Sequence, residues 1–307
     1  MTISSKICGI CVIRDAVDLV PFLCGHYLRI GFDRLAFVDD HSSDGTYEKL
    51  RTISAKEPKV SVRRSGGGAF NHSPLMTEAA NRVIAEGYEI VFPFDCDEFW
   101  NIDARRIYAA AGSAQSGLFV GRWVQFVQWR QYATPKRRYL LAVRNRAPAL
   151  SDTNLATVES FRRSFVCVPA PKVAFKSSTP VEIARGQHSL TSGPTKILAD
   201  DLEVFHLPIR SISEVERRAR RAHRHLETAK PGEDWQSVHF RDAVAVGKLA
   251  DVWRANSASN DGCLDVQDER IMLIPDNRLR VLLIRAWLYI AVRHPWQLLF
   301  DGGLRSA

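Results

Sequence analysis

The chain has 307 residues, of which 46% are hydrophobic and 25% charged, a composition typical of a folded protein with one large domain or one domain and an extension. Its net charge of +8 favours an anionic partner: a nucleotide, a phospholipid surface or a nucleic acid. The N-terminal residues lack the pattern of a signal peptide, and no uninterrupted apolar run of about 18 residues occurs, so we expect no membrane-spanning helix. Six scattered cysteines complete no zinc-binding spacing and are expected to be reduced structural thiols.

The first 100 residues predict alternating strands and helices. Apolar runs predict strands at 7–13, 34–39, 60–64 and 89–95. Helical spacing and capping residues predict helices at 18–31, 46–55 and from Ser73 to Glu86, with Thr46 and Ser73 as N-caps. Strands that alternate with helices predict an α/β fold: a single Rossmann-type, mostly parallel sheet with helices on both faces.

The pattern changes beyond residue 117. Alternating aromatic and valine residues predict strands in 117–130, and further strands are expected at 172–176 and 201–209. A helix is expected at 213–229, where Ser213 and Glu216 would form a capping box. We expect residues 1–229 to be one domain with halves at 1–100 and 101–229, followed by a C-terminal helical extension at 230–307.

Three acids crowd together directly after the fourth predicted strand, in "FPFDCDEFW". Asp95, Asp97 and Glu98 would repel one another unless a cation joined them. Mg²⁺ and Mn²⁺ prefer carboxylate oxygens, and a diphosphate can bridge to either ion. The Asp95-Cys96-Asp97 motif therefore predicts a metal site, and the alternative is that these acids cap a following helix.

A second acidic stretch, "VDDHSSDGT", follows the second predicted strand. Asp39 or Asp40 could accept hydrogen bonds from a nucleotide base or a ribose, whereas the same residue types also suit a plain turn. Because ligands of parallel sheets bind at the carboxyl ends of strands, we expect both acidic clusters to face one crevice.

These two motifs resemble the family 2-like glycosyltransferases of the GT-A fold, and in particular a subgroup with a D-x-D-E-F motif. The segment "VIRDAVDLVPFLCGHYLRIGFD" is similar to the start of that subgroup, although Asp15-Ala16 replaces its usual Asn-Glu. "KVAFK", "GQHS" and "FHLPIRS" are also similar, so the resemblance covers about residues 7–225.

The resemblance implies a nucleotide-sugar donor and Mn²⁺ or Mg²⁺ as cofactor. It assigns the base contact to Asp40, with Asp39 as the alternative, and metal, ribose or diphosphate contacts to Asp95 and Asp97. Glu98 matches the acid that follows the D-x-D motif in that subgroup, but the resemblance assigns it no defined role.

Further candidates complete this implied site. A metal-binding histidine would be His206, with His188 second, and either could instead be structural. Lys172 could hold diphosphate oxygens or be a solvated lysine. The acceptor would be a glycan, a lipid-linked hydroxyl or another hydroxyl, as in bacterial-type surface polysaccharide or glycoconjugate synthesis. No motif identifies the general base that would take the proton from the acceptor hydroxyl, and Glu159 and Asp152 are the candidates.

Other functions compete with this interpretation: a phosphotransferase that uses the D-x-D motif, or a non-catalytic protein that binds glycan or nucleic acid. The arginine-rich helix 213–229 suggests nucleic acid, but no nucleic-acid module is recognisable, and we expect no nucleic-acid partner.

We expect a cytoplasmic protein that could bind peripherally to the inner face of a membrane through 277–300. There Arg278, Arg285 and Arg293 recur near one helical face. Apolar residues on the same helix would add to the membrane contact: Leu282, Leu283, Trp287, Ile290 and Ala291. The alternative is that this helix packs on the catalytic domain.

Overall fold

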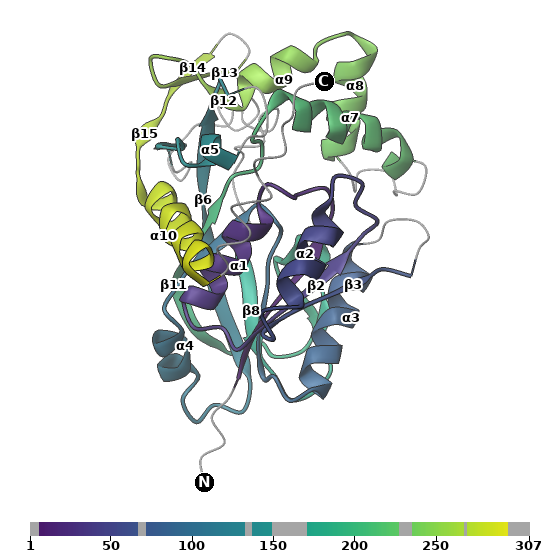
Figure 1. The fold of residues 1–307 in the computed structure, drawn as a ribbon, viewed down its shortest axis with the longest axis vertical. Coiled ribbons are helices and arrows are strands. Elements are labelled where there is room, and N and C mark those ends of the chain that lie inside the picture. The colour runs from purple at the N-terminus through teal and green to yellow at the C-terminus, as the bar shows by residue number, and fades with distance from the viewer. Residues whose placement is uncertain are drawn as a thin grey trace. The chain divides into compact units, whose positions relative to one another are not determined.

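The computed structural model describes residues 6–66, 72–132, 137–148, 171–226, 235–266 and 269–293 (Figure 1). The chain divides into two compact units. The first unit comprises Met1–Arg122, Pro171–Val204 and Val281–Ala307, and the second comprises Trp123–Ala170 and Phe205–Arg280. The predicted domain limit at residue 229 stays a prediction.

A six-strand path of the sheet lies in the first unit, in the order β6-β8-β4-β1-β2-β3. Its strands are β1 (Ile7–Ile13), β2 (Arg34–Asp39), β3 (Val60–Arg64), β4 (Ile90–Pro93), β8 (Lys172–Lys176) and the beginning of β6 (Gly117–Trp129). Strand β1 pairs in parallel with β2 and β4, and β2 pairs in parallel with β3. Strand β8 runs antiparallel to β4 and β6. The predicted α/β class with a mostly parallel sheet is confirmed.

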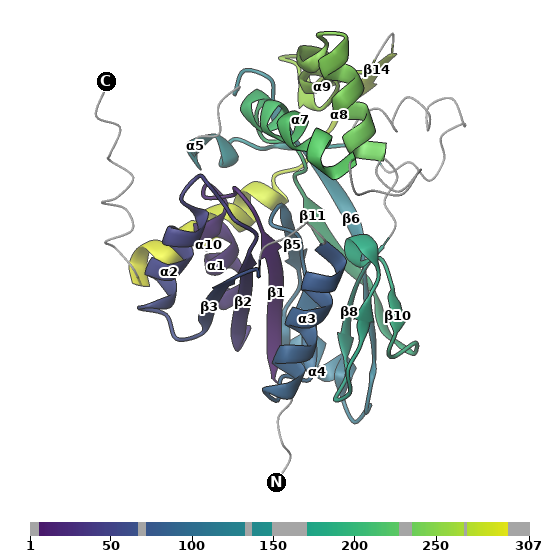
Figure 2. The same cartoon turned by 90° about the vertical axis from the view of Figure 1, so that its right-hand side faces the viewer.

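Helices cover both faces of this sheet, as predicted. The helices of the first unit are α1 (Val20–Arg29), α2 (Thr46–Ser54), α3 (His72–Ala85), α4 (Ala104–Ala111) and most of α10 (Arg278–Arg293). Helix α3 packs on the face of β1 that carries Ile10. On the opposite face, Tyr27 of α1 stacks on Phe94, whose ring lies against Gly9. Figure 2 shows α3 on one side of the strands and α1 on the other.

The predicted N-caps Thr46 and Ser73 are both wrong, although the predicted start of the helix at residue 46 is correct. Helix α2 begins at Thr46 and its N-cap is Gly45, whose φ of 91° is a left-handed conformation that suits glycine. Helix α3 already includes His72, so Ser73 is not an N-cap, and its hydroxyl donates to the carbonyl of Ile183 instead. Short strands β5 (Glu98–Asn101), β9 (Glu182–Ile183) and β10 (Leu190–Ser192) complete the unit, together with the 3-10 turn η2 (Arg185–Gln187).

The second unit mixes helices with short strands. Its elements after the crossing strand β11 (Ile197–His206) are α7 (Ile212–Leu226), α8 (Trp235–Ala245), α9 (Leu249–Ala255), β12 (Ser257–Ala258), β13 (Cys263–Val266), β14 (Glu269–Met272) and β15 (Ile274–Pro275). Before them come α5 (Arg137–Leu140) and β7 (Asn145–Arg146). The prediction of a wholly helical tail is therefore wrong for β12 to β15, which are too short to carry a clear alternating pattern.

The predicted capping box is also displaced. Helix α7 begins at Ile212, and the hydroxyl of Ser211 accepts from the backbone N–H of Glu214. Ser211 and Glu214 thus match the same Ser-x-x-Glu pattern as Ser213 and Glu216, two residues earlier.

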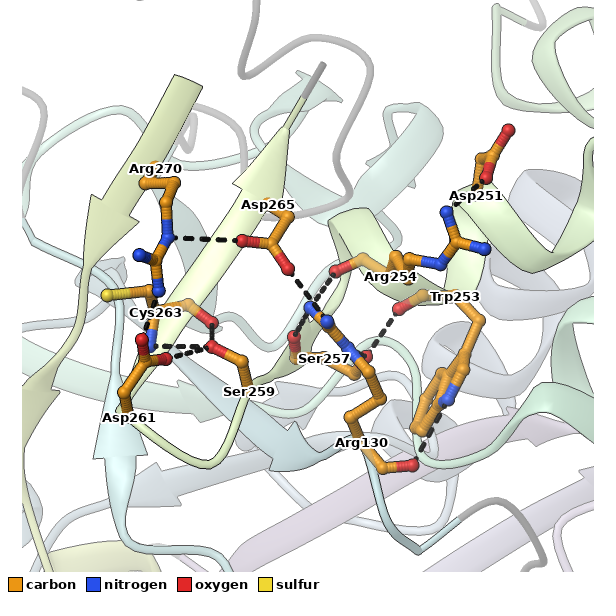
Figure 3. Close-up of polar contacts among 10 residues, drawn as sticks. All are labelled: Arg130, Asp251, Trp253, Arg254, Ser257, Ser259, Asp261, Cys263, Asp265 and Arg270. Carbon is orange, nitrogen blue, oxygen red and sulfur yellow. Dashed lines mark hydrogen bonds and ion pairs between the residues drawn. The ribbon is translucent and has the colours of Figure 1, made fainter. Parts of the chain in front are cut away.

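Arg130, just beyond β6, holds the second unit's strands and helix α9 together (Figure 3). Its guanidinium lies 2.7 Å from Asp265 Oδ2 and donates to the carbonyls of Arg254 and Ser257. Its own carbonyl accepts from the indole N–H of Trp253. These contacts place Arg130 in a structural role.

Candidate active site

The candidate site lies at the carboxyl edge of the first unit's sheet. Strands β4, β1 and β2 are neighbours and run in parallel. Asp95 comes just after β4 and Asp39 is the last residue of β2, so both lie at the same edge of the sheet. Two strand spacings separate them, roughly 10 Å. The structure thus brings the two predicted acidic clusters, which are far apart in the sequence, to one edge of one sheet.

A buried lysine lies between two of the crowded carboxylates. Lys172 Nζ, on β8, is 3.0 Å from Asp95 Oδ2 and 2.8 Å from Glu98 Oε1. The side chain of Lys172 is 1% exposed and that of Glu98 0%, whereas that of Asp95 is 32% exposed. The ammonium therefore offsets the repulsion between the carboxylates of Asp95 and Glu98. One side of Asp95 remains open to solvent.

Gln187 and His72 complete the environment of Asp95. Gln187 Nε2 donates to Asp95 Oδ1 at 3.0 Å, and His72 Nε2 lies 3.2 Å from the same oxygen. Lys172 also donates to Gln187 Oε1 and to the carbonyl of Gly186. Gln187 and His72 are not among the residues predicted from the sequence, although Gln187 belongs to the "GQHS" segment.

Gln187 has a left-handed backbone, with φ of 55°. A non-glycine residue in this conformation is strained by of order 1–3 kcal/mol, and such strain clusters at functional sites. The strain is maintained here by the hydrogen bonds that Gln187 makes to Lys172 and Asp95.

The charges of this cluster support one another. Burial by itself would raise the pKa of Asp95, but Lys172 and then His72 hold it well below its usual range. Burial would lower the pKa of Lys172, but Asp95 and Glu98 raise it. Asp95 is therefore an ionised acceptor, and Lys172 an ammonium, throughout the neutral range.

The composition of the cluster is compatible with a divalent cation. The three carboxyl groups of Asp95, Asp97 and Glu98 outnumber the single ammonium of Lys172 that pairs with two of them. Within the described part of the chain, no three His, Cys, Asp or Glu side chains are grouped as a metal site. Mg²⁺ commonly uses one or two carboxylates, waters and substrate phosphates, and that donor set fits what Asp95 and Asp97 offer.

The loop after β2 distinguishes Asp39 from Asp40. Both carboxylate oxygens of Asp40 are engaged, Oδ2 by Arg14 at 2.9 Å and Oδ1 by the hydroxyl of Ser65 at 3.1 Å. Asp39 is 0% exposed, and its Oδ2 accepts from the backbone N–H of Ser42. Asp39 Oδ1 is buried and has no hydrogen-bond partner among the described residues. An unpaired buried acceptor is costly, and of the two acids Asp39 is the one with capacity for another donor.

Asp15 shapes this loop from the end of β1. Its Oδ1 accepts from the backbone N–H of Ser43 at 2.6 Å, and its own N–H donates to the hydroxyl of Ser42. Asp15 and His41 both have left-handed backbones, with φ of 45° and 52°. Asp15 thus holds the loop that begins with Asp40, directly after Asp39 at the end of β2.

The remaining predicted site residues lie in three places. His206 belongs to the second unit, where its Nδ1 is 2.7 Å from Gln125 Oε1 and its ring stacks on Trp123. His188 is in the first unit, with Nδ1 3.1 Å from the carbonyl of Pro171. Glu159 and Asp152 lie outside the described residues.

Comparisons with known proteins give no family. No protein-family model matches this chain, and no curated protein is similar to it in sequence. Similar solved structures include TarS of S. aureus, which is 12% identical with a TM-score of 0.36, over 82% of this chain and 44% of that one. The chain therefore spans less than half of that TarS chain.

Two further structures contain ligands. The mannosyltransferase PcManGT from Pyrobaculum calidifontis, in complex with GDP-Man and Mn²⁺, is 12% identical with a TM-score of 0.36, over 98% of this chain and 80% of that one. TarS 1-349 of S. aureus in complex with UDP is 12% identical with a TM-score of 0.35, over 80% of this chain and 70% of that one. We take the function from this chain's own side chains.

Proposed function

We propose that this protein is a glycosyltransferase that moves a sugar from a nucleoside-diphosphate sugar to a hydroxyl acceptor with the help of Mn²⁺ or Mg²⁺. The observation that carries the proposal is the cluster of Asp95, Asp97 and Glu98 at the carboxyl end of β4, in which Lys172 pairs with Asp95 and Glu98 and keeps Asp95 ionised. The resemblance of the two acidic motifs to family 2-like glycosyltransferases points to the same chemistry.

Asp39 is the acid that we assign to the nucleoside. Its buried Oδ1 can accept a base N–H or a ribose hydroxyl, while Asp40 already binds Arg14 and Ser65. This reverses the order of preference that the resemblance implies. Asp40 then acts indirectly, because its ion pair with Arg14 fixes the loop between β2 and α2.

Asp97 and Asp95 would hold the metal ion. When bound, the ion supplies positive charge to the departing nucleoside diphosphate. Lys172 keeps the carboxylate of Asp95 ionised and in one orientation, and Gln187 fixes its other oxygen. A direct contact of Lys172 with diphosphate stays a prediction. In the structure its ammonium already faces four protein acceptors.

His206 remains our first candidate for a further metal or phosphate contact, because the "FHLPIRS" segment that contains it resembles that of the glycosyltransferase subgroup. His188 is the second candidate. The acceptor is a glycan or a lipid-linked or other hydroxyl, as in surface polysaccharide or glycoconjugate synthesis. If the reaction inverts the sugar, a carboxylate must take the acceptor proton, and Glu159 and Asp152 stay the candidates.

The test is release of nucleoside diphosphate from a panel of nucleotide sugars, with and without Mn²⁺. We expect one or more sugars to be turned over by wild type with Mn²⁺, and Asp97→Asn to lose at least about a hundredfold in rate, as loss of electrostatic stabilisation of a leaving group does. Asp201→Asn is the matched control, since Asp201 is an exposed acid of the same unit that pairs with Arg106.

Thermal melting gives a second measurement. Mn²⁺ with a nucleoside diphosphate should raise the melting temperature of wild type and of Asp201→Asn, because a ligand of the folded state stabilises it by mass action. Equal shifts in wild type and Asp97→Asn would contradict the assignment of the metal to this motif. No nucleotide release from any sugar nucleotide would contradict the proposed activity.

A further inference from the structure

Helix α10 has an inner face that packs tightly on α1 of the first unit. Leu283, Ala286 and Ile290 are buried, at 0%, 0% and 2% exposure. A Cβ atom at Gly25 of α1 would lie 2.1 Å from the carbonyl oxygen of Ala286, so the two backbones touch where Gly25 has no side chain. Figure 1 shows the yellow α10 beside the purple α1. This face has its partner and is not available to another molecule.

The outer face of α10 is apolar and exposed. Val281, Leu288 and Val292 are 41%, 49% and 80% exposed. Their spacing of seven and four residues places them on one side of the helix. Three of the apolar residues that the sequence offered for membrane contact, Leu282, Leu283 and Ile290, are instead buried, so that prediction chose the wrong apolar stripe.

The charges around this outer face have one sign. Residues 278–293 contain four arginines and no acidic residue. Arg278 and Arg280 contact Asp276 and the carbonyl of Leu141, whereas Arg285 and Arg293 are exposed on the part of α10 in the first unit. Arg285 falls between Val281 and Leu288 on the same side. Arg293 lies over the ring of Tyr289, with 4.6 Å between guanidinium carbon and ring centroid.

A third arginine adds to this surface from α1. Arg29 follows Gly25 by one helical turn, which directs it toward α10. Burial, and then the positive charge of Arg285, lower the pKa of Arg29. Arg29 Nε is buried without a hydrogen-bond partner, and no carboxylate pairs with Arg29 or Arg285 within the described part of the chain. Two neighbouring guanidinium groups without an acid are a binding feature for an anion.

We propose that the outer face of α10, formed by Val281, Arg285, Leu288 and Val292 with Arg29 beside it, docks on a bilayer that contains anionic phospholipid. Apolar side chains interspersed with arginines on one helix face suit the boundary between headgroups and acyl chains. The arginines would meet lipid phosphates, and each basic residue near such a surface contributes binding. A second copy of this chain fits less well, because it would bring the same positive charges face to face. No described helix is long and apolar enough to cross a bilayer.

The experiment is flotation of the full chain with vesicles of phosphatidylcholine alone or of phosphatidylcholine with phosphatidylglycerol. We expect flotation with the anionic vesicles, loss of it at high salt, and little binding to the neutral vesicles. Arg285→Gln should weaken the binding about fivefold, and Leu288→Ser and Val292→Ser should weaken it as well. Arg105→Gln, which changes an exposed arginine of α4, is the matched control and should float like wild type.

These variants leave the inner face of α10 unchanged, so their melting temperatures should equal that of wild type. Equal flotation of all variants, or equal binding to neutral vesicles, would overturn the proposal. So would a dimer, seen by sedimentation without lipid, that Leu288→Ser dissociates, since the face would then belong to a second copy. Because nucleotide release needs no vesicle, the outcome is independent of the proposed glycosyl transfer.

Discussion

At the residue scale, the feature that organises the site is the ion pair between β8 and the acids after β4. Lys172 and Asp95 are 77 residues apart in the sequence, and the lysine is as deeply buried as the core around it. A buried pair is held by its mutual attraction and hydrogen bonds against a large loss of hydration. Asp95 and Glu98 therefore depend on Lys172 as their counter-charge.

Lys172→Met tests this dependence. Removal of the ammonium leaves Glu98 buried and Asp95 half-buried without their counter-charge, and loss of one partner of a buried pair costs about 3–5 kcal/mol. We expect the free energy of unfolding in urea to fall by that amount. The double variant Lys172→Met with Glu98→Gln should recover part of the loss, because the buried negative charge is then gone as well.

Lys176→Met is the matched control on the same strand. Lys176 is also buried, at 9% side-chain exposure, but its Nζ lies 3.9 Å from Glu89 Oε2 and the side chain of Glu89 is 38% exposed. Lys176→Met therefore leaves no buried carboxylate behind, and we expect a loss of about 1 kcal/mol or less. Equal losses for Lys172→Met and Lys176→Met would show that the ion pair contributes nothing specific.

At the element scale, the sequence predicted those strands best that carry uninterrupted apolar runs. β1, β2 and β8 have the predicted bounds, because a buried strand must be apolar at nearly every position, and β3 has them too although only its two valines are apolar. Helix starts were less predictable, since Ser211 and Ser213 both fit the same capping pattern, and in the structure it is Ser211 that makes the cap contact with Glu214. In α10 the sequence places apolar residues on several sides of the helix. Only the contact with Gly25 shows which of these sides packs against α1.

The site was predictable in its acids and not in their partners. Strand ends, where a parallel sheet places its ligand-binding groups, pointed to Asp95 and Asp97 and to the pair Asp39 and Asp40, but they left that pair as alternatives and the resemblance put Asp40 first. Lys172, Gln187 and His72 reach Asp95 through the antiparallel strand β8, the turn η2 and the start of α3. No local sequence pattern predicts which distant cationic side chain will pair with which acid.

Gly25→Ala tests the packing of α10 on α1. An added methyl group would meet the backbone of Ala286 rather than a movable side chain, and such overpacking costs typically 1–3 kcal/mol. The better helix propensity of alanine offsets about 1 kcal/mol of this at most. We therefore expect a lower free energy of unfolding in urea.

Gly66→Ala provides the comparison. An ideal Cβ at Gly66 meets no atom within 4 Å, so the stability should stay the same or rise by up to about 1 kcal/mol through the less flexible unfolded chain. If Gly25→Ala were as stable as Gly66→Ala, the contact between α1 and α10 would be loose, and the assignment of inner and outer faces would lose its basis.

At the scale of the whole molecule, the two compact units are interleaved along the chain. The first unit takes its residues from three segments and the second from two, and β6, β11 and α10 each contribute to both. The core of the second unit joins α7 with residues far beyond 229, such as Phe240, Val252 and Trp253. Each such side chain contributes about 1.5–3 kcal/mol when it is buried.

A fragment of residues 1–229 therefore tests the domain limit that the sequence predicted. It would lack Phe240 and Trp253, which cover Val215 and Ala219 of α7, and it would lack α10, which covers Gly25 of α1. Two apolar surfaces would be exposed at once, and we expect a broad thermal transition, binding of a dye that reports exposed apolar surface, and a weaker near-ultraviolet circular dichroism signal than the full chain gives. A sharp transition within a few degrees of the full chain would instead establish 1–229 as a domain that folds independently. The clustering of α7 with α8 and α9 in one core makes the first result the expected one, because a helix that has lost the apolar side chains packed against it retains little stability of its own.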